Sequence, residues 1–328
     1  MHGKSRQTGA IPAPADADAQ VAATGVRQVL VDGERDGQRV DNFLFGLLKG
    51  VPKTHVYRLL RTGQVRINGR RAKPDTRIAG GDLVRVPPVR IAPATEAPRA
   101  SERSLESLAS RIVFEDRNFI AIDKPSGLAS HGGSGIRLGA IEQIRQLRPD
   151  ESLELVHRLD RDTSGVLLFA RRRSALTGVQ AQIREGRVRK RYLSLLAGRL
   201  PQARTFVDVA LRKQVLQGGE RMVRVDPEGK ASRSEFRVLQ QHGDFSYVEI
   251  VIDTGRTHQI RVHAQHLGAP VAGDDKYGDA EANRRLREHG LRRLFLHAAE
   301  LAFELPDGTR YHLAAPLPDE LARVLDAF

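Results

Sequence analysis

The sequence predicts an α+β protein with a small N-terminal domain followed by a larger, strand-rich domain. Apolar residues recur at helical spacing in short stretches, as in residues 40–48, 138–147 and 174–185. Runs of β-branched and aromatic residues, which are typical of strands, recur from residue 111 to residue 313. Residues 89–104 are rich in Pro, Ala and Arg without a hydrophobic period, and they predict a linker between the two domains.

Composition limits the class of protein. The 328 residues are 40% hydrophobic, which is enough for a core, and they include no cysteine, which excludes a disulfide framework and a thiolate zinc site. No apolar run approaches the roughly 20 residues that a membrane span requires. Residues 1–20 also lack the apolar segment of a secretory signal. We therefore expect a cytoplasmic protein that does not enter a membrane.

The charge balance points to a polyanionic partner. The chain has 53 Lys and Arg against 40 Asp and Glu, a net charge of +13 and a pI near 10.5. Arginine dominates the cations, and its planar guanidinium suits phosphate groups and base edges. This balance favours a nucleic acid as the partner, and a basic surface that serves only solubility is the alternative.

The first 88 residues predict a tail and a small domain. Residues 1–25 are rich in Ala, Pro, Gly and Asp without an apolar period, so we expect a disordered tail. Residues 26–88 form the small domain, with these elements expected in order: a helix at 40–48, a helix at 56–60, a strand at 65–67, an Asn68-Gly69 turn and a strand at 83–86.

The string RVDNFL…VPKTHVYRLLRTGQVRINGRRAKPDTRIAGGDLVRV, within residues 39–86, resembles the ribosomal-protein-S-four-like RNA-binding domain. The resemblance implies a small αL-type domain whose helices and following loop present a basic face to structured RNA. We expect four of its cations to contact RNA: Arg58, Arg61, Arg70 and Arg71. A small helical cap with ordinary surface charge is the alternative.

The larger domain, residues 105–328, is organised around a polar stretch that leads into an apolar one. Residues 157–165 (HRLDRDTSG) predict a loop, and residues 166–170 (VLLFA) predict a buried strand. A loop held against a buried strand is a rigid place for reactive side chains. On composition alone, a solvated turn in which Asp160 and Asp162 cap backbone amides is the commoner explanation.

The string HRLDRDTSG resembles the HRLDxxTSG signature of the RluA-type pseudouridine synthases. Other strings of that family occur in the expected order, namely KPSGL at 124–128, RKRYL at 189–193, TGRTHQIRVH at 254–263 and VAGDDKYGD at 271–279. The resemblance covers about residues 38–88 and 110–318. It implies a mixed, mostly antiparallel central sheet flanked by helices.

The resemblance also implies roles for individual residues. Asp160 is the catalytic aspartate, and Arg261 is expected to pair with it and orient it. Tyr192 is expected to stack on the target base, and its hydroxyl is a candidate for proton transfer, although a phenol with a pKa near 10 needs help as a base. Arg158 is expected to fill the gap left by a flipped uridine. We further expect His157 and Thr163 to contact RNA.

The implied reaction isomerises uridine to pseudouridine: the bond from ribose to the ring nitrogen breaks, the base turns, and a bond to a ring carbon forms. It transfers no phosphate and no electrons, so we expect no cofactor. Thr257 is expected to cap a helix that carries His258, His263 and His266. Their spacings of five and three residues do not place all of them on one helical face, so we expect no metal site.

The substrate is suggested by one further stretch. Residues 217–230 (QGGERMVRVDPEGK) resemble the RluC-like subfamily, which modifies uridines 955, 2504 and 2580 of 23S ribosomal RNA. We therefore expect large-subunit ribosomal RNA as the partner, no obligatory protein partner, and a monomer. Three alternatives stay open: a synthase for other ribosomal or transfer RNA uridines, a glycoside hydrolase that pairs Asp160 with a second carboxylate, and a non-catalytic RNA-binding ribosome-assembly factor.

Overall fold

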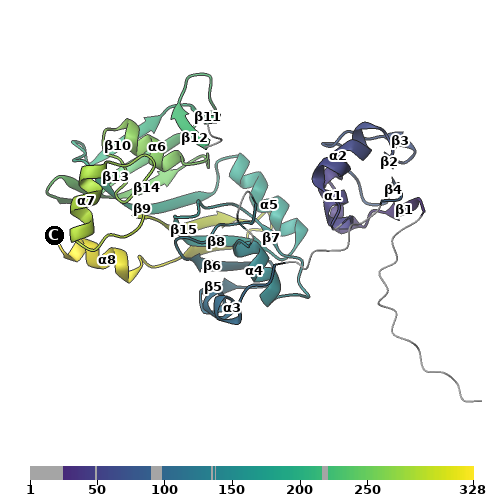
Figure 1. Cartoon of the computed structure of the whole chain (residues 1–328), viewed down its shortest axis with the longest axis horizontal. Helices are drawn as coiled ribbons and strands as arrows, with labels where there is room; N and C mark the ends of the chain where they lie inside the picture. The colour runs from purple at the N-terminus through teal and green to yellow at the C-terminus, as the bar shows by residue number, and fades with distance from the viewer. Residues whose placement is uncertain (1–24, 49, 90–97, 134–135, 137, 216–220) are drawn as a thin grey trace, which may run out of the picture. The chain divides into compact units, whose positions relative to one another are not determined.

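The computed structural model describes residues 25–48, 50–89, 98–133, 136, 138–215 and 221–328 (Figure 1). The chain divides between residues 97 and 98 into two compact units, here called the N-terminal unit and the C-terminal unit. The tail predicted for residues 1–25 lies outside the described residues except for Gly25, and it stays a prediction. Within the described residues, no helix is both long enough and apolar enough to cross a membrane.

The N-terminal unit combines a small sheet with two helices. Its elements are β1 (Arg27–Leu30), the 3-10 helix η1 (Gly33–Arg35), α1 (Val40–Leu47), α2 (Lys53–Arg61), β2 (Arg66–Ile67), β3 (Arg70–Arg71) and β4 (Leu83–Val86). The strands pair antiparallel in the order β1-β4-β2-β3. Both predicted helices and the predicted turn are confirmed. Asn68 and Gly69 have φ angles of 49° and 78°, the left-handed pair that a tight two-residue hairpin requires.

The core of the N-terminal unit follows from the helical spacing. Val40, Phe43 and Leu44 of α1 pack with Val56 and Leu59 of α2, all almost fully buried. Burial on one side of each short helix leaves its other side to solvent. The basic residues of α2 therefore lie at the surface.

The C-terminal unit contains a mixed sheet with helices on both faces (Figure 1). Its helices are α3 (Glu102–Ala109), α4 (Ala140–Leu147), α5 (Arg173–Arg184), α6 (Gln259–His266), α7 (Ala280–Glu288) and α8 (Asp319–Asp326). Its strands are β5 (Ile112–Glu115), β6 (Phe119–Lys124), β7 (Glu154–Leu155), β8 (Ser164–Ala170), β9 (Arg189–Ala197), β10 (Arg204–Asp208), β11 (Leu211–Val215), β12 (Arg221–Val225), β13 (Arg233–His242), β14 (Phe245–Ile252), β15 (Leu296–Glu304) and β16 (Arg310–Ala314).

The strand order of this sheet is β10-β13-β14-β9-β15-β8-β6-β5, with β16 beside β15 and β7 beside β8. Of the described strand pairs in this unit, β8 and β15 alone run parallel. The mixed, mostly antiparallel sheet that the family resemblance implied is therefore confirmed. β11 and β12 form a separate hairpin, and β12 contacts α6.

Central strand β8 shows how the sheet builds a core on each face. Leu167 and Phe169 point to the face covered by α4 and α6, where Ile144 and Ile260 lie. Alternate β8 residues point to the opposite face, where Leu168 packs against α5 and β16. Because both faces are covered, every residue of β8 is buried, as its continuous apolar run predicted.

The linker prediction is wrong at its C-terminal end. Residues 98–104 belong to the C-terminal unit, and α3 begins at Glu102 behind Ser101, whose side chain accepts a hydrogen bond from Ser104 N–H (3.2 Å). The Ser104 hydroxyl also donates to the Gln143 side chain on α4 (2.9 Å). This helix depends on contacts with α4, which the composition of the segment does not reveal. Residues 90–97 lie outside the described part of the chain.

Candidate active site

The loop that carries Asp160 connects β7 to β8, and the segment after β6 holds it in place. The Ser130 hydroxyl donates to Leu159 O (2.7 Å) and accepts from Leu159 N–H (2.9 Å). The Ser126 hydroxyl donates to Asp162 O (2.8 Å). Because these bonds fix the backbone on both sides of Asp160, the position of its carboxylate is set by the fold. The Asp160 side chain is 29% exposed, so it remains accessible to a substrate.

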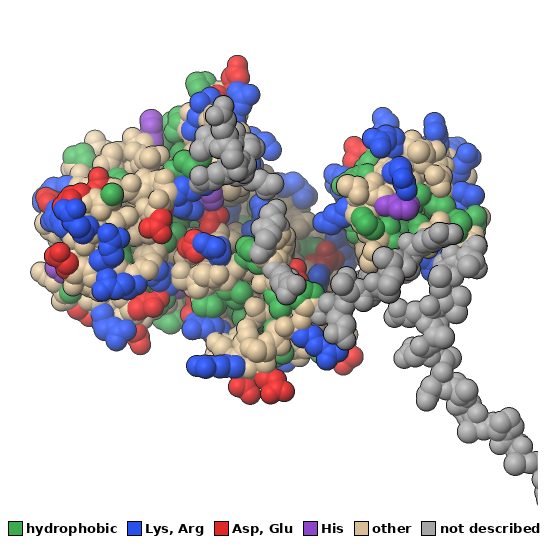
Figure 2. All heavy atoms as spheres, viewed as in Figure 1, with side chains coloured by type: hydrophobic (Ala, Val, Ile, Leu, Met, Phe, Trp, Pro, Cys, Tyr) green, Lys and Arg blue, Asp and Glu red, His purple; other side chains and the backbone are tan. Residues whose placement is uncertain are grey.

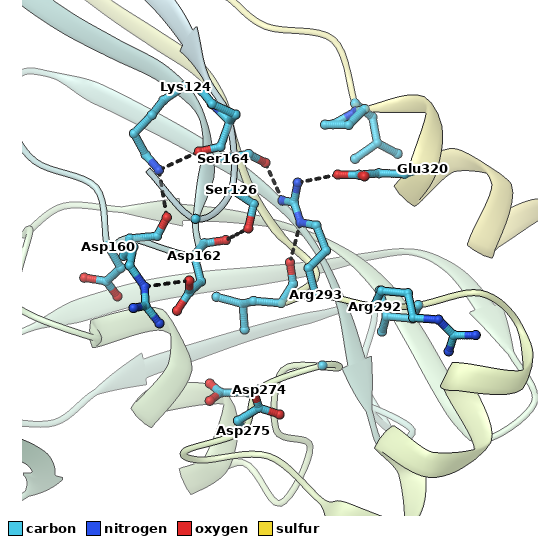
Figure 3. Close-up of a pocket in the computed structure, with 18 of the residues that line it drawn as sticks. Lys124, Ser126, Asp160, Asp162, Ser164, Asp274, Asp275, Arg292, Arg293 and Glu320 are labelled. Atoms are coloured by element: carbon cyan, nitrogen blue, oxygen red, sulfur yellow. Dashed lines mark hydrogen bonds and ion pairs between the residues drawn. The ribbon is translucent and has the colours of Figure 1, made fainter. Parts of the chain in front are cut away.

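Lys124 connects the segment after β6 to the loop that carries Asp160 (Figure 3). Its ammonium group is fully buried and donates to the carbonyl oxygens of Pro125 (2.9 Å), Leu128 (2.7 Å) and Arg161 (3.0 Å). Burial lowers the pKa of Lys124 to about 7, while three carbonyl acceptors match the three N–H donors of the charged form. This explains the lysine of the KPSGL string as a residue that fixes the loop carrying Asp160.

Gly165 allows the loop that carries Asp160 to enter the sheet. A Cβ atom at this position would lie 2.1 Å from Ala298 O on β15, and the φ angle is 109°. Residues with a side chain rarely adopt this backbone conformation. The glycine of the HRLDRDTSG string therefore lets β8 approach β15 closely enough for their parallel pairing.

Asp160 and Arg261 lie together, as the family resemblance implied. Arg261 Nη1 is 3.5 Å from Asp160 Oδ2. The closer partner of Arg261 is Asp274, which accepts from Nε at 2.7 Å and from Nη2 at 2.8 Å. The sequence analysis predicted that Arg261 pairs with Asp160 but did not predict its contact with Asp274. One buried guanidinium lies between the two carboxylates.

Both partners of the buried Arg261–Asp274 pair stay charged. Burial alone would raise the pKa of Asp274, but hydrogen bonds and charge from Arg261 hold it below its usual range. Burial alone would lower the pKa of Arg261, but Asp274 and then Asp160 raise it, so the guanidinium stays charged. Asp274 also accepts from the backbone N–H groups of Lys276 (2.9 Å) and Tyr277 (3.0 Å). The string VAGDDKYGD contained this residue, although nothing in it singled out Asp274.

Tyr192 on β9 faces the same cavity as Asp160. Its side chain is 9% exposed, and a small cavity of about 70 Å³ is lined by Tyr192, Asp160, Thr163 and Arg261, among others. Burial, and then the negative charge of Asp160, raise the pKa of Tyr192. The phenol therefore keeps its proton at neutral pH, which favours stacking or hydrogen-bond donation over the role of a general base.

Two larger clefts open from this cavity. One, of about 1400 Å³, is lined by Asp162, Arg293 and the exposed Arg292. The other, of about 1010 Å³, is lined by the exposed Arg158, Arg184 and Arg256. Asp160 lines both clefts and the small cavity, so its carboxylate lies where all three meet. Each cleft contributes cations, which suits a polyanionic chain that passes the carboxylate.

The three predicted RNA contacts in the loop differ in environment. Arg158 is exposed, with Nη1 3.2 Å from His131 Nε2, and it remains a candidate to fill a gap in RNA. Thr163 is 2% exposed and can meet only a group that enters the small cavity. His157 Nε2 accepts from Leu168 N–H (3.3 Å), and burial together with Lys190 lowers its pKa to about 4. A neutral, backbone-bonded His157 supplies no charge to phosphate, so its RNA contact stays a prediction.

The four cations predicted to bind RNA in the small domain lie on the surface of the N-terminal unit, on α2 (Arg58, Arg61) and β3 (Arg70, Arg71). Figure 2 shows Lys and Arg side chains gathered on the visible surface of this unit. Arg71 donates to Thr62 O (3.4 Å), and Arg58 Nη2 lies 3.4 Å from His55 Nε2. These contacts leave the guanidinium groups exposed for phosphate.

The prediction that Thr257 caps α6 is wrong. The helix begins at Gln259, and its cap is His258, whose backbone is left-handed with φ 54°. Burial lowers the pKa of His258, whose Nε2 lies 4.0 Å from Asp160 Oδ2. The motif contained His258, but only the turn before α6 brings its ring to the carboxylate.

The other two histidines of this segment do not form a metal site with His258. The His263 ring lies between the hydroxyls of Ser232 (3.0 Å) and Ser234 (2.9 Å). Among the described residues, no group of three or more His, Cys, Asp or Glu side chains is arranged to hold a metal ion.

Comparison with known proteins identifies the family of this chain. The model of the RNA pseudouridylate synthase family matches residues 118–266, and that of the S4 domain matches residues 38–84. The chain is 45% identical over 313 residues to ribosomal large subunit pseudouridine synthase C of Pasteurella multocida, covering 94% of this chain and 96% of that protein. It is 48% identical over 305 residues to the protein of the same name from Escherichia coli K12, covering 92% and 96%.

A solved structure extends the likeness to the fold. The solved structure is that of a human protein named RNA Pseudouridylate Synthase Domain Containing 4. The match covers 69% of this chain and 95% of the human chain, with a TM-score of 0.57 and 26% sequence identity. The sequence identity to the curated relatives extends over nearly the whole of both chains. The chain therefore belongs to the RNA pseudouridylate synthase family and is an RNA pseudouridine synthase.

Proposed function

We propose that this enzyme isomerises specific uridines of 23S ribosomal RNA, those of the 955, 2504 and 2580 class, with Asp160 as the nucleophile. The observation that carries the proposal is the position of Asp160, which lies where two cation-bearing clefts and a small cavity meet, beside Arg261 at 3.5 Å. The names of the relatives, which refer to the large ribosomal subunit, support this substrate.

In the proposed reaction, the target uridine leaves its stack and enters the small cavity. Tyr192 lines that cavity and presents a protonated phenol ring against which the base can stack. The Asp160 carboxylate then adds either to the ribose carbon or to the uracil ring, and the bond between ribose and ring nitrogen breaks. After the base turns, the ribose bonds to the ring carbon, that carbon loses its proton, the ring nitrogen freed from the ribose gains one, and the carboxylate is released. A base stacked in the small cavity fills space that water would otherwise occupy.

Arg261 and Arg158 have different tasks in this scheme. Arg261 is fixed by Asp274 and holds the nearby Asp160 oxygen, so the nucleophile is oriented before the substrate arrives. Arg158 is exposed beside the same cavity, where its side chain can replace the flipped base in the RNA stack. The clefts on either side give the flanking nucleotides a path lined by Arg293 on one side and Arg256 on the other.

The N-terminal unit supplies affinity for the RNA in this proposal. Its S4 domain presents the exposed cations Arg58, Arg61, Arg70 and Arg71. Phosphate contacts of this kind strengthen binding without reading sequence. We further propose that the enzyme acts in the cytoplasm as a monomer without an obligatory protein partner and needs no cofactor.

Membership in the family excludes two of the three alternatives raised by the sequence, a glycoside hydrolase and a non-catalytic assembly factor. The third, a synthase for other uridines, is decided by experiment. Pseudouridines should be mapped in ribosomal and transfer RNA from a strain that lacks the gene, and in its 23S RNA after treatment with the purified enzyme. Loss and restoration at the three proposed positions is the expected result. Loss at other positions would overturn the target assignment.

The same RNA tests the nucleophile. The Asp160→Asn variant should form no pseudouridine while its RNA affinity stays within a few-fold of the wild type, because Asp160 contributes chemistry and few phosphate contacts. Substantial product from the purified variant would refute the assignment of Asp160.

A further inference from the structure

One residue beside the catalytic carboxylate has an unusual backbone. His258 has φ 54° and ψ 20°, a left-handed conformation that residues other than glycine seldom adopt. Its side chain makes no capping bond to α6, so the helix does not require a histidine there. Such conformations persist where the surroundings hold the residue in place, and they concentrate at functional sites. The contacts of the ring show what holds it.

One ring nitrogen of His258 is bonded to a tyrosine. Its Nδ1 lies 2.8 Å from the Tyr277 hydroxyl, and the two rings meet edge to face at 5.5 Å. The same hydroxyl accepts a hydrogen bond from Val223 N–H on β12 (3.0 Å). Tyr277 is 2% exposed, so its buried proton needs an acceptor. Because the amide can only donate, Nδ1 is the acceptor that these contacts offer.

This bonding fixes the tautomer of the imidazole. When Nδ1 accepts, the proton of a neutral ring lies on Nε2. Burial lowers the pKa of His258, outweighing the attraction of Asp160, so the ring is neutral at pH 7. The charged and titratable groups around it are Asp160, Arg261, Lys276, Asp274 and Tyr277.

The other ring nitrogen faces the catalytic carboxylate. Nε2 lies 4.0 Å from Asp160 Oδ2, and Arg261 Nη1 lies 3.5 Å from the same oxygen. Catalytic hydrogen bonds are often this long before substrate binds, and they shorten in the complex. Two donors that converge on Oδ2 leave Oδ1 for bonding to the substrate.

We propose that His258 is a positioning residue for Asp160: the Tyr277 hydroxyl fixes the tautomer with its proton on Nε2, and this N–H orients the carboxylate together with Arg261. The inference rests on the proposed role of Asp160 as the nucleophile. It also gives the β11–β12 hairpin a connection to the active site, because Val223 holds the tyrosine. Leu211 of the hairpin and Val262 of α6 pack in the same small cluster as Tyr277 and Val223.

Two substitutions of His258 separate a donor from a backbone requirement. In His258→Gln the side-chain amide nitrogen lies near the position of Nε2, whereas in His258→Asn it lies near Nδ1. Asparagine tolerates a left-handed backbone better than glutamine does. If Nε2–H orients Asp160, the glutamine variant keeps more turnover although the asparagine variant is at least as stable. If only the backbone matters, the asparagine variant is better in both measurements, and the inference is refuted.

The tyrosine offers a matched pair of variants. Tyr277→Phe removes the hydroxyl bonded to His258, and Tyr311→Phe removes a buried hydroxyl that contacts Asn118 and Asp116 instead. We expect Tyr277→Phe to lower kcat on 23S RNA about tenfold with little change in KM, because the carboxylate is less well oriented while RNA contacts remain. Tyr311→Phe should leave kcat unchanged. Equal kcat in both variants would overturn the inference.

The tautomer itself can be observed by nitrogen NMR of isotopically labelled histidine, with the His258→Gln spectrum identifying the resonance. The expected result at pH 7 is a neutral ring protonated on Nε2 in the wild type and a mixture of tautomers in Tyr277→Phe. A wild-type ring protonated on Nδ1, or charged, would refute the inference while the proposed function stands if the wild type forms pseudouridine. A wild type with the expected tautomer but no product on 23S RNA would refute the proposed function instead.

Discussion

The Arg261–Asp274 pair is the feature whose removal the structure predicts most sharply. The Asp274 side chain is fully buried and Arg261 is 9% exposed. Asp274 Oδ1 accepts from Arg261 Nη2 and from two backbone N–H groups, and Oδ2 accepts from Arg261 Nε. In Asp274→Asn, the three donors at Oδ1 keep the amide oxygen there. The new NH₂ group must then face the N–H of Arg261 Nε.

The expected loss follows from these contacts. One charge-assisted hydrogen bond is worth roughly 1.5–3 kcal/mol, and a broken buried ion pair costs roughly 3–5 kcal/mol. Asp160, at 3.5 Å, still compensates part of the arginine charge, so we expect about 3 kcal/mol. For a unit of this size, each kcal/mol lowers the Tm by about 2–4 °C, which gives a total of about 6–12 °C.

Differential scanning calorimetry at pH 7 measures the shift, and single-turnover kinetics on 23S RNA should show slower product formation by the same variant. Glu228→Gln is the matched control, because it also replaces a carboxylate with an amide. The Glu228 carboxylate is exposed and lies 2.8 Å from the half-exposed Arg212. Surface pairs contribute about 0–1 kcal/mol, so the control should melt within about 4 °C of the wild type. A shift in Asp274→Asn no larger than that of the control would refute the reasoning.

Three further outcomes are expected. A protein that begins at Pro98 should fold and still modify some uridine in naked RNA. Its slope of log affinity against log salt should be shallower by about 0.9 for each phosphate that the N-terminal unit neutralises. An unchanged slope would show that the N-terminal cations do not bind RNA. Gly165→Ala should destabilise the protein strongly, by calorimetry, because the new methyl would lie 2.1 Å from Ala298 O; near-wild-type stability would show that β15 can move. Burial lowers the pKa of His263 and His297 from 6.5 to about 4. The unfolded chain therefore takes up protons on these rings before the folded chain does. The free energy of unfolding should keep its full value above pH 6.5 and fall as the pH drops toward 4, by up to about 1.4 kcal/mol per pH unit for each ring. Urea titrations at several pH values in this range give the free energy of unfolding, which should fall less steeply with pH in His263→Gln than in the wild type. An equal dependence on pH would contradict this account.

Local patterns in the sequence determined the elements and the identity of the central residues. The apolar spacing at 40–48 and the run at 166–170 predicted α1 and β8, because one-sided and two-sided burial leave different periods in a sequence. The Asn68-Gly69 dipeptide predicted its turn, because it combines two residues that tolerate positive φ. Asp160, Tyr192 and Arg261 were assigned from strings that stand in order along the chain, and the structure brings all three to one cavity.

Only the tertiary structure decided which side chains hold those residues. Asp274 and His258 meet Arg261 and Asp160 because α6 and the segment after it fold back against the loop before β8. Sequence spacing does not encode the distance between residues about 100 positions apart, since that depends on the strand order and on the parallel pairing of β8 with β15.

The two errors of the sequence analysis have the same origin. The start of α3, residues 102–104, was predicted as linker because the side chains that stabilise this segment lie on α4, far away in the sequence. Thr257 was predicted as a cap because it is a good capping residue, but the backbone turns at His258, whose ring is held by Tyr277. Local propensity is a weak preference of a few tenths to about 1 kcal/mol per residue, and packing within the fold outweighs it. The family of this protein was therefore readable in its strings, whereas the arrangement of side chains around the Asp160 carboxylate exists only in the folded chain.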